Sequence, residues 1–208
     1  MTTYFAFPCM ETVSTAFFEK ILNLQFPGDI KYGVSRSSLV YDARNALAKQ
    51  AIAYGCDRIM WIDSDMIFEP DLALRLAEDM DEGRDFVSGL YFKRKNPIKP
   101  VIYKDIGYIY TDVKIPYAIS YTDYPRDSIF EIKGCGLGGC MMSTKIVEEV
   151  SKQFGSPFDP QPGFGEDLSF CIRLEAMGIP MYCDSRVKMG HVAQTIVTEE
   201  TFDTGLKL

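Results

Sequence analysis

The sequence predicts an α/β fold in which helices cover both faces of a central sheet. Two observations indicate it. Apolar segments of strand length alternate with segments of helical periodicity in the first part of the chain, which is the pattern of parallel βαβ units. The 208 residues are 47% apolar, which is enough for the interior of one ordinary domain. We therefore expect a single domain over residues 1–208.

Two strand–helix units open the chain. A strand is expected at residues 4–7, and the helix after it stops at Pro27 and Gly28. A second strand at residues 30–34 leads to a helix over about residues 38–54, which Gly55 ends. The apolar positions along one side of these two helices are Val13, Phe17, Ile21, Leu22, Leu39, Ala43, Ala46, Leu47 and Ile52.

A third unit begins with a strand at residues 58–62. Its helix has Pro70 in the first turn, carries apolar residues at Leu72, Leu76 and Met80, and stops before a fourth strand at residues 86–90. Because parallel strands end at one edge of a sheet, ligand residues are expected in the loops at that edge. The half formed by about residues 1–95 is therefore expected to bind a nucleotide.

The remaining half, about residues 96–208, begins differently. Prolines, tyrosines and short strand-like pieces fill residues 96–132, which predicts antiparallel or irregular structure. A glycine-rich segment at 134–139 then shapes an acceptor wall or forms a simple bulge before an apolar strand. Helices are expected at 145–154 and from Asp167 to Gly178, with a loop at 155–163 between them that could close over a substrate.

Composition excludes several classes of protein. Apolar stretches are too short for a membrane span and no signal peptide is evident, so we expect a cytoplasmic protein. The six cysteines form no Cys-x-x-Cys pair, which argues against structural zinc and favours buried apolar roles. A net charge of −7 disfavours a general nucleic-acid binder. One basic cluster, Lys93-Arg94-Lys95 with Lys99, is either a phosphate contact or a solvated loop.

The most informative motif is Asp63-Ser64-Asp65, which directly follows the buried strand at residues 58–62. In an extended chain both carboxylates point to one side, close enough to share a divalent cation and the diphosphate that it carries. The alternative is a turn followed by a helix cap, since aspartate favours both.

Two later features point to the same site. Gly165 precedes Glu166 and Asp167 at the start of a helix, where a carboxylate is either a cap or an acid aimed into a cleft. His191, the one histidine, follows the strand near residues 181–184 and is either structural or a third ligand for Mn²⁺ beside Asp65.

Taken in order along the chain, these elements resemble the GT-A glycosyltransferases, in particular the family 2-like group and its compact bacterial and phage relatives. The segments that carry the resemblance are the first strand, Asp42-Ala43-Arg44-Asn45, Trp61 to Asp65, Gly138-Gly139, Gly165-Glu166-Asp167 and His191. The resemblance covers most of the chain. It implies a Rossmann-like mixed sheet with helices on both faces, and a nucleotide-sugar-binding half followed by an acceptor-binding and catalytic half.

The resemblance also implies roles for particular residues. Asp63 would lie near the ribose, Asp65 and His191 would bind Mn²⁺ or Mg²⁺, and Arg44 would face the base or diphosphate, unless it forms a surface ion pair. Asp167 matches the catalytic base of inverting members, with Glu166 beside it. The nucleotide-sugar-binding residues are then Pro8, Arg44, Asp63, Ser64 and Asp65, and Gly138 and Gly139 lie on the acceptor side.

The expected reaction is transfer of a sugar from a nucleotide-diphosphate-sugar, most simply a UDP-sugar, to an acceptor hydroxyl with inversion. A glycan, a protein and a hydroxylated base in phage DNA all remain open as acceptors. Two other classes compete with this interpretation. A sugar nucleotidyltransferase would need a glycine-rich basic loop after the first strand, where the chain has Pro8 to Thr12 instead. A non-catalytic module that binds a nucleotide-sugar or glycan would keep the fold alone.

Overall fold

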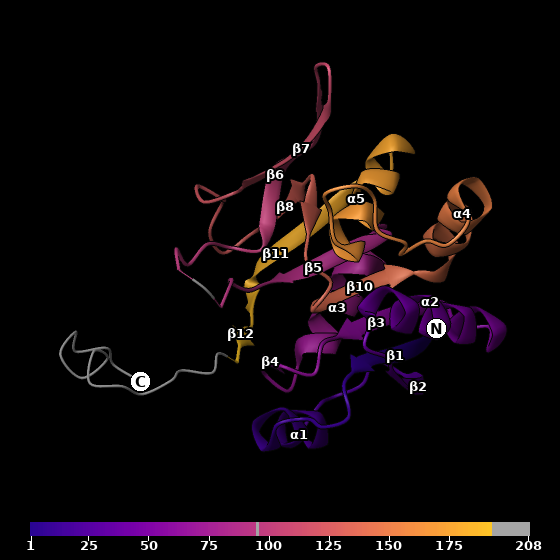
Figure 1. The fold of residues 1–208 in the computed structure, drawn as a ribbon. Helices are drawn as coiled ribbons and strands as arrows, with labels where there is room; N and C mark the ends of the chain where they lie inside the picture. The colour runs from indigo at the N-terminus through magenta and orange to yellow at the C-terminus, as the bar shows by residue number, and fades with distance from the viewer. Residues whose placement is uncertain (95, 193–208) are drawn as a thin grey trace.

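The computed structural model describes residues 1–94 and 96–192. Its centre is a seven-stranded mixed sheet, drawn in Figure 1. From one edge to the other, the strands are β2 (Asp29–Arg36), β1 (Thr2–Cys9), β3 (Arg58–Ile62), β10 (Gly139–Ser143), β5 (Phe86–Leu90), β11 (Met181–Lys188) and β8 (Ile129–Ile132). The predicted α/β class with a mixed sheet is confirmed.

Strand directions show how the two halves of the sequence combine. Strands β2, β1 and β3 are parallel, and β5 is parallel to β11. Strand β10, from the second half, runs antiparallel between β3 and β5, and β8 is antiparallel at the far edge. The first half therefore does not form a separate parallel sheet, because β10 separates β3 from β5.

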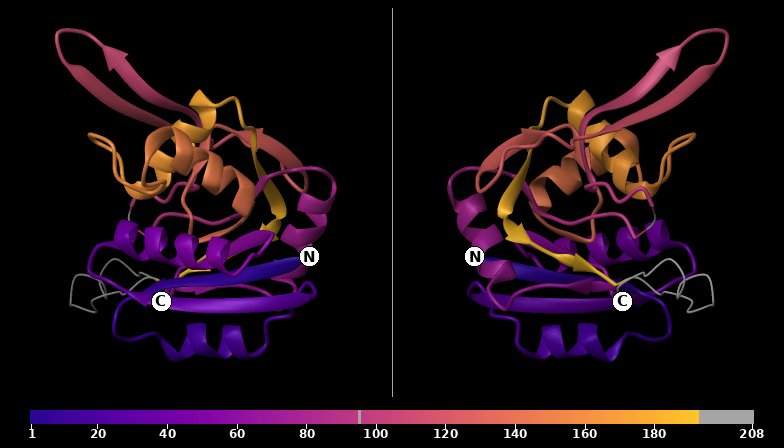
Figure 2. Two further views of the ribbon diagram at one scale, coloured as in Figure 1. Left: turned by 90° about the vertical axis from the view of Figure 1, so that its right-hand side faces the viewer. Right: turned by 90° about the vertical axis from the view of Figure 1, so that its left-hand side faces the viewer.

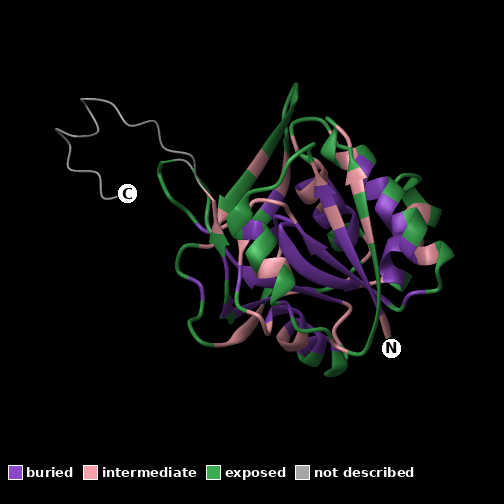
Figure 3. Cartoon of the chain, turned by 90° about the horizontal axis from the view of Figure 1, so that it is seen from below, coloured by how far each residue is buried: buried purple, intermediate pink, exposed green. Residues whose placement is uncertain are grey.

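Helices cover both faces, and alternating side chains of each strand supply two cores. Helices α2 (Val40–Ala53), α4 (Thr144–Phe154) and α5 (Glu166–Ala176) pack with Trp61 of β3 in one core. Helices α1 (Thr15–Leu22) and α3 (Leu72–Asp81) pack with Met60 in the other. Figure 2 shows α1 and α2 on opposite sides of the sheet, and Figure 3 shows its buried strands at the centre of the molecule.

Two small sheets complete the fold. Strands β6 (Ile102–Tyr110) and β7 (Lys114–Ser120) form a hairpin that projects from the body, and β6 also pairs with β9 (Gly134–Cys135). This confirms antiparallel structure in the segment without helical periodicity. Strand β12 (Gly190–His191) pairs with β4 (Met66–Ile67), which directly follows the acidic motif.

Several apolar positions expected on one side of the first two helices are exposed. Val13 and Leu22 are 45% and 68% exposed because α1 is only eight residues long and buries Phe17 alone. Leu39, which is 47% exposed, precedes the first turn of α2, and Ala46 lies on the outer side of that helix. The strands at 58–62 and 86–90 match the prediction residue for residue.

The cysteines are free, and five of the six are buried, as expected of small apolar residues. Within the described ranges, no helix is long and apolar enough to cross a membrane.

Candidate active site

The acidic motif lies at the carboxyl end of β3, beside the start of β10. The backbone N–H of Asp63 donates to the carbonyl oxygen of Gly138 at 3.1 Å, which continues the pairing of β3 with β10. The N–H of Met66 donates back to the carbonyl oxygen of Asp63 at 3.1 Å and closes a turn. The motif is therefore a turn, and its carboxylates are free to make other contacts.

Pairing of β12 with β4 brings His191 to Asp65 across 126 positions of sequence (191 − 65). The N–H of Val192 donates to the carbonyl oxygen of Asp65 at 2.8 Å and fixes the approach. Nε2 of His191 then lies 3.4 Å from Oδ2 of Asp65. The two residues that the resemblance assigns to a metal are therefore neighbours.

Asp65 and His191 offer two candidate ligands for a divalent cation. Its Nδ1 lies 3.0 Å from the carbonyl oxygen of Phe92, so in the neutral ring Nδ1 donates and Nε2 keeps a lone pair facing Asp65. A carboxylate and an imidazole together suit Mn²⁺. In residues 1–94 and 96–192, no group of three or more His, Cys, Asp or Glu side chains is placed to hold a metal, so further ligands would come from diphosphate or water.

Asp65 and His191 also shift one another's pKa. The hydrogen bond to Asp65 raises the pKa of His191. Burial alone would raise the pKa of Asp65, but His191 and the guanidinium of Arg94 outweigh burial and hold it below its usual range. Arg94 donates from Nη1 to Oδ2 of Asp65 at 2.8 Å. The Asp65 carboxylate is therefore ionised, as a metal ligand must be.

Arg44 is buried, with only 1% of its surface exposed. Its Nη2 donates to both carboxylate oxygens of Asp63, at 2.8 and 3.1 Å, and its Nε donates to Glu166 at 3.1 Å. Its guanidinium also stacks over Trp61, 5.3 Å from the ring centroid. Arg44 is therefore not a surface ion pair on α2. It joins the acidic motif to the start of α5.

Asp167 and Glu166 form the first turn of α5. The N-cap residue is Gly165, which has no side chain to cap the helix, and Asp167 accepts only from the N–H of Leu168 at 2.7 Å. Burial, followed by the charge of Glu166, raises the pKa of Asp167 to about 6. A carboxylate with this pKa is ionised at neutral pH and still basic enough to accept a proton.

Two cavities meet at the acidic motif. The first is lined by Pro8, Cys9, Met10, Ser37, Ser38, Val40, Ala43, Asp63, Ser64 and Asp65. The second, of about 380 Å³, is lined by Arg44, Asp63, Asp65, Tyr91, Lys93, Arg94, Val101, Leu137, Glu166, Asp167 and His191. Asp63 and Asp65 border both, so a ligand that spans the cavities crosses these two carboxylates.

The second cavity contains Tyr91, which the sequence analysis does not identify. The N–H of Gly138 donates to Oη of Tyr91 at 3.1 Å, and the ring packs edge-on against His191. A Cβ on Gly136 would lie 2.1 Å from that oxygen, so a glycine is required there. Gly138 lies beside Tyr91 and Asp63, whereas Gly139 packs into the sheet against Met189, and neither glycine lines either cavity. Tyr91 directly follows β5, and its position at the carboxyl end of a strand is the sequence feature that could have identified it as a site residue.

Lys93 and Arg94 are also residues of this cavity. The sequence leaves their basic cluster between a phosphate contact and a solvated loop, and the structure places both at the site. Lys95 lies outside the described residues, and Lys99 is exposed. Ser37 and Ser38, which line the first cavity, carry no recognisable motif and were missed.

The mixed sheet and its flanking helices have the architecture of a GT-A fold, as the resemblance implies. No protein-family model matches the sequence, and a search of curated proteins gives no match. Among solved structures, A197 from STIV matches with a TM-score of 0.63 and 21% identity, over 93% of this chain and 87% of A197.

A second matching structure is S. aureus TarS 1-349. It matches with a TM-score of 0.55 and 14% identity over 92% of this chain, and in complex with UDP-GlcNAc with 0.56 and 14% over 95%. This chain spans 60% of TarS 1-349. Identities this low show a shared fold.

Proposed function

We propose that this protein is a metal-dependent glycosyltransferase that moves a sugar from a nucleotide-diphosphate-sugar to an acceptor hydroxyl. The observation that carries the proposal is the meeting of two cavities at Asp63 and Asp65, with the carboxylate of Asp167 in the second cavity only. A nucleotide-sugar consists of a nucleoside and a sugar joined by a diphosphate, so two cavities that share one border match its two ends. The UDP-GlcNAc complex of TarS, which shares the fold, supports a UDP-sugar as donor.

The nucleoside would occupy the first cavity. Its walls combine apolar surface, from Pro8 and Val40 among others, with the hydroxyls of Ser37 and Ser38. Asp63, at the shared border, would accept from the ribose hydroxyls. Arg44 also lines the second cavity, where its Nε and Nη2 bind Glu166 and Asp63 while its buried Nη1 has no hydrogen-bond partner among the described residues. Its role is to hold both carboxylates in position.

The diphosphate would lie at the border between the cavities. Asp65 and His191 would hold Mn²⁺ or Mg²⁺ there, and the cation supplies positive charge against the departing diphosphate. Lys93 and Arg94 add positive charge on the same side of the cavity. Arg94 binds Asp65 in this structure, so its guanidinium is already within reach of a phosphate that a cation would hold beside Asp65.

Asp167 would act as general base. It takes the proton from the acceptor hydroxyl as that oxygen forms a bond to the anomeric carbon, and the bond from this carbon to the diphosphate oxygen breaks. The electron pair leaves with the nucleoside diphosphate. Attack from the side opposite the leaving group inverts the anomeric configuration, and we propose an inverting reaction on this basis.

The acceptor would approach past α5 and the β6–β7 hairpin. The sequence suggests that the loop at 155–163 could close over a substrate. In the structure, three side chains hold this loop in place against the body of the protein. Asn45 donates to Asp159 at 2.8 Å, Arg173 donates to the carbonyl oxygen of Pro157 at 2.9 Å, and Ser169 accepts from the N–H of Gln161 at 2.7 Å. A glycan, a protein or a hydroxylated base of phage DNA would each offer the required hydroxyl.

Slow hydrolysis of the donor by water tests the proposal without knowledge of the acceptor. UDP-, GDP-, CMP- and dTDP-sugars are incubated with the protein, with and without Mn²⁺, and the released nucleotide is measured. Metal-dependent release of a nucleoside diphosphate from one donor is expected, and proton NMR of the product sugar should show inversion. Pyrophosphate formed from a nucleoside triphosphate and a sugar phosphate would instead indicate a nucleotidyltransferase. Binding of a donor without any turnover would indicate a non-catalytic module.

A further inference from the structure

Strand β2 is the outermost strand of the central sheet. One side pairs with β1 along its whole length, from Thr2 opposite Asp29 to Cys9 opposite Arg36. The other side pairs with no strand of the described residues. Alternate N–H and C=O groups of an eight-residue strand are therefore directed outward, which is a template for another strand.

Beside this free edge lies a row of exposed apolar side chains. Ile30, Tyr32 and Val34 are 37%, 72% and 57% exposed and share one face of the strand. They continue the face that Phe5 of β1, opposite Tyr32, presents to the second core. Phe26 packs edge-on against Phe5 and is itself 43% exposed, so it extends the row. A continuous exposed apolar patch of this kind is a mark of an interface.

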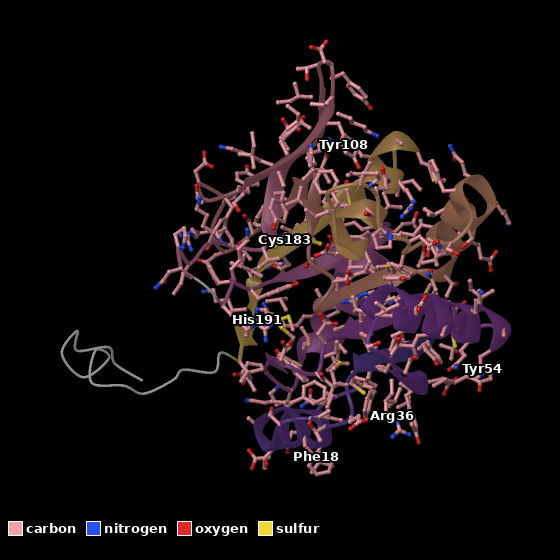
Figure 4. The ribbon with its side chains drawn as sticks, in the orientation of Figure 1. Phe18, Arg36, Tyr54, Tyr108, Cys183 and His191 are labelled. Carbon is pink, nitrogen blue, oxygen red and sulfur yellow. The ribbon has the colours of Figure 1, made fainter. Side chains whose placement is uncertain are left out.

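The one lysine of β2 does not protect its free edge. Lysine on an edge strand normally discourages pairing. The ammonium of Lys31, however, donates to the carbonyl oxygen of Tyr54 at 2.7 Å and lies over the Tyr54 ring, at the end of α2 on the opposite face (Figure 4). Residues 29–36 contain no proline, and their pairing with β1 has no bulge.

We propose that β2 pairs antiparallel with β2 of a second copy of this chain, around a two-fold axis at Tyr32. Residues opposite each other in an antiparallel pair lie on the same face, so the axis passes through a residue. With the axis at Tyr32, Ile30 lies opposite Val34 of the partner subunit and the apolar rows join.

The two neighbouring registers place charged side chains in unfavourable pairs. An axis at Lys31 places that lysine opposite the partner's Lys31, and an axis at Gly33 places Ile30 opposite the partner's Arg36. With the axis at Tyr32, the charged residues Asp29 and Lys31 lie opposite the partner's Ser35 and the partner's Gly33, which are uncharged. The strand is therefore complementary to itself in one register, which favours a second copy over an unrelated partner.

The dimer would leave both candidate active sites open. Eight residues of strand span roughly 26 Å. The end of β2 at Arg36 leads to Ser37 and Ser38 of the first cavity, and antiparallel pairing would place the first cavities of the two copies at opposite ends of the shared edge. Donor binding should therefore not depend on dimerisation.

Light scattering after gel filtration tests the interface, with the full chain over a range of concentrations. The wild-type protein is expected to form a dimer, and Tyr32→Asp is expected to be a folded monomer that has lost only the concentration-dependent part of the wild-type melting temperature. Tyr110→Asp removes a tyrosine that is 76% exposed on the β6–β7 hairpin and should leave the dimer intact. A monomeric wild type, or a dimer that survives Tyr32→Asp, would overturn the proposal.

Disulfide cross-linking tests the register. Cα atoms directly opposite in an antiparallel pair lie about 4.5–5.5 Å apart, within disulfide range. Oxidised Tyr32→Cys should therefore give a covalent dimer, whereas Val34→Cys should not, because its partner position is Ile30. The wild type under the same oxidant controls for Cys9, which is the partly exposed native cysteine. Cross-linking through Val34→Cys but not Tyr32→Cys would contradict the register.

Discussion

At the residue scale, the environment of Asp167 determines what the site can do. Gly165 offers no side chain at the N-cap of α5, and Asp167 accepts from the N–H of Leu168 in the first turn, in a partly buried position beside Glu166. Burial, followed by the charge of Glu166, raises the pKa of Asp167 to about 6. Burial and the charge of Glu166 make Asp167 a stronger base, and for the same reason its ionised form destabilises the folded protein.

Asp167→Asn should stabilise the protein and abolish turnover. The unfolded carboxyl titrates near about 4, so the cost of ionising Asp167 in the folded state develops as the pH rises from about 4 to 6 and is complete above 6. The variant should gain about 2 kcal/mol in the free energy of unfolding at pH 8 and almost nothing at pH 4. Urea unfolding at both pH values measures this. Asp112→Asn, an exposed control on the hairpin, should show no gain. An Asp167→Asn protein that is less stable at pH 8 would contradict the assignment.

At the element scale, α3 and β11 meet at a second acidic pair that lies outside both cavities. Asp79 is 6% exposed and Asp184 is 1% exposed, and Arg186 binds Asp184 at 2.8 Å and Asp79 at 3.2 Å. Oδ2 of Asp79 has no hydrogen-bond partner. Burial, followed by the charge of Asp184, raises the pKa of Asp79 to about 6. Ionisation of Asp79 therefore weakens the contact between α3 and β11.

Asp79→Asn should raise the melting temperature above pH 6 by a few degrees, and should change it little near pH 4, because the raised pKa means that only ionisation is costly. Differential scanning fluorimetry across this pH range gives the comparison. Glu78→Gln changes the exposed neighbour on the same helix and serves as the control. An equal change at both pH values would indicate a packing effect instead.

Elements were more predictable than the contacts between them. The strands at 58–62 and 86–90 are mostly apolar and are buried at every position, so their bounds can be predicted from the local sequence. The pairing of β12 with β4 and the insertion of β10 between β3 and β5 depend on long-range packing that no local pattern encodes. For the same reason, the sequence indicated Asp65 and His191 as candidates, while Tyr91 became visible only in the fold.

At the scale of the whole molecule, Arg44 connects the two halves of the chain. It extends from α2 in the first half, binds Asp63 at the end of β3, and binds Glu166 at the start of α5 in the second half. Burial alone would lower its pKa, but the charges of Asp63 and Glu166 outweigh burial and raise it, so the guanidinium remains charged. This residue therefore joins the end of β3 to the start of α5.

Arg44→Ala should destabilise the protein by about 3–5 kcal/mol, because it leaves two carboxylates without their cation. The loss is expected in urea unfolding at pH 7. Lys49→Ala removes a charge from the exposed side of the same helix and should cost less than about 0.5 kcal/mol. A small loss for Arg44→Ala, similar to that of the control, would show that the bridge does not join the halves.

The central claim is that two carboxylates have separate roles. Asp65 holds the donor through a metal, and Asp167 accepts the proton of the acceptor hydroxyl. Calorimetric titration with the hydrolysed donor and Mn²⁺, paired with the hydrolysis rate, measures this division in the wild type, Asp65→Ala and Asp167→Asn. We predict that Asp65→Ala loses metal-dependent donor binding, and that Asp167→Asn binds the donor normally but turns over about 10²–10⁴-fold more slowly. Normal donor binding by Asp65→Ala, or near-normal turnover by Asp167→Asn, would contradict the account.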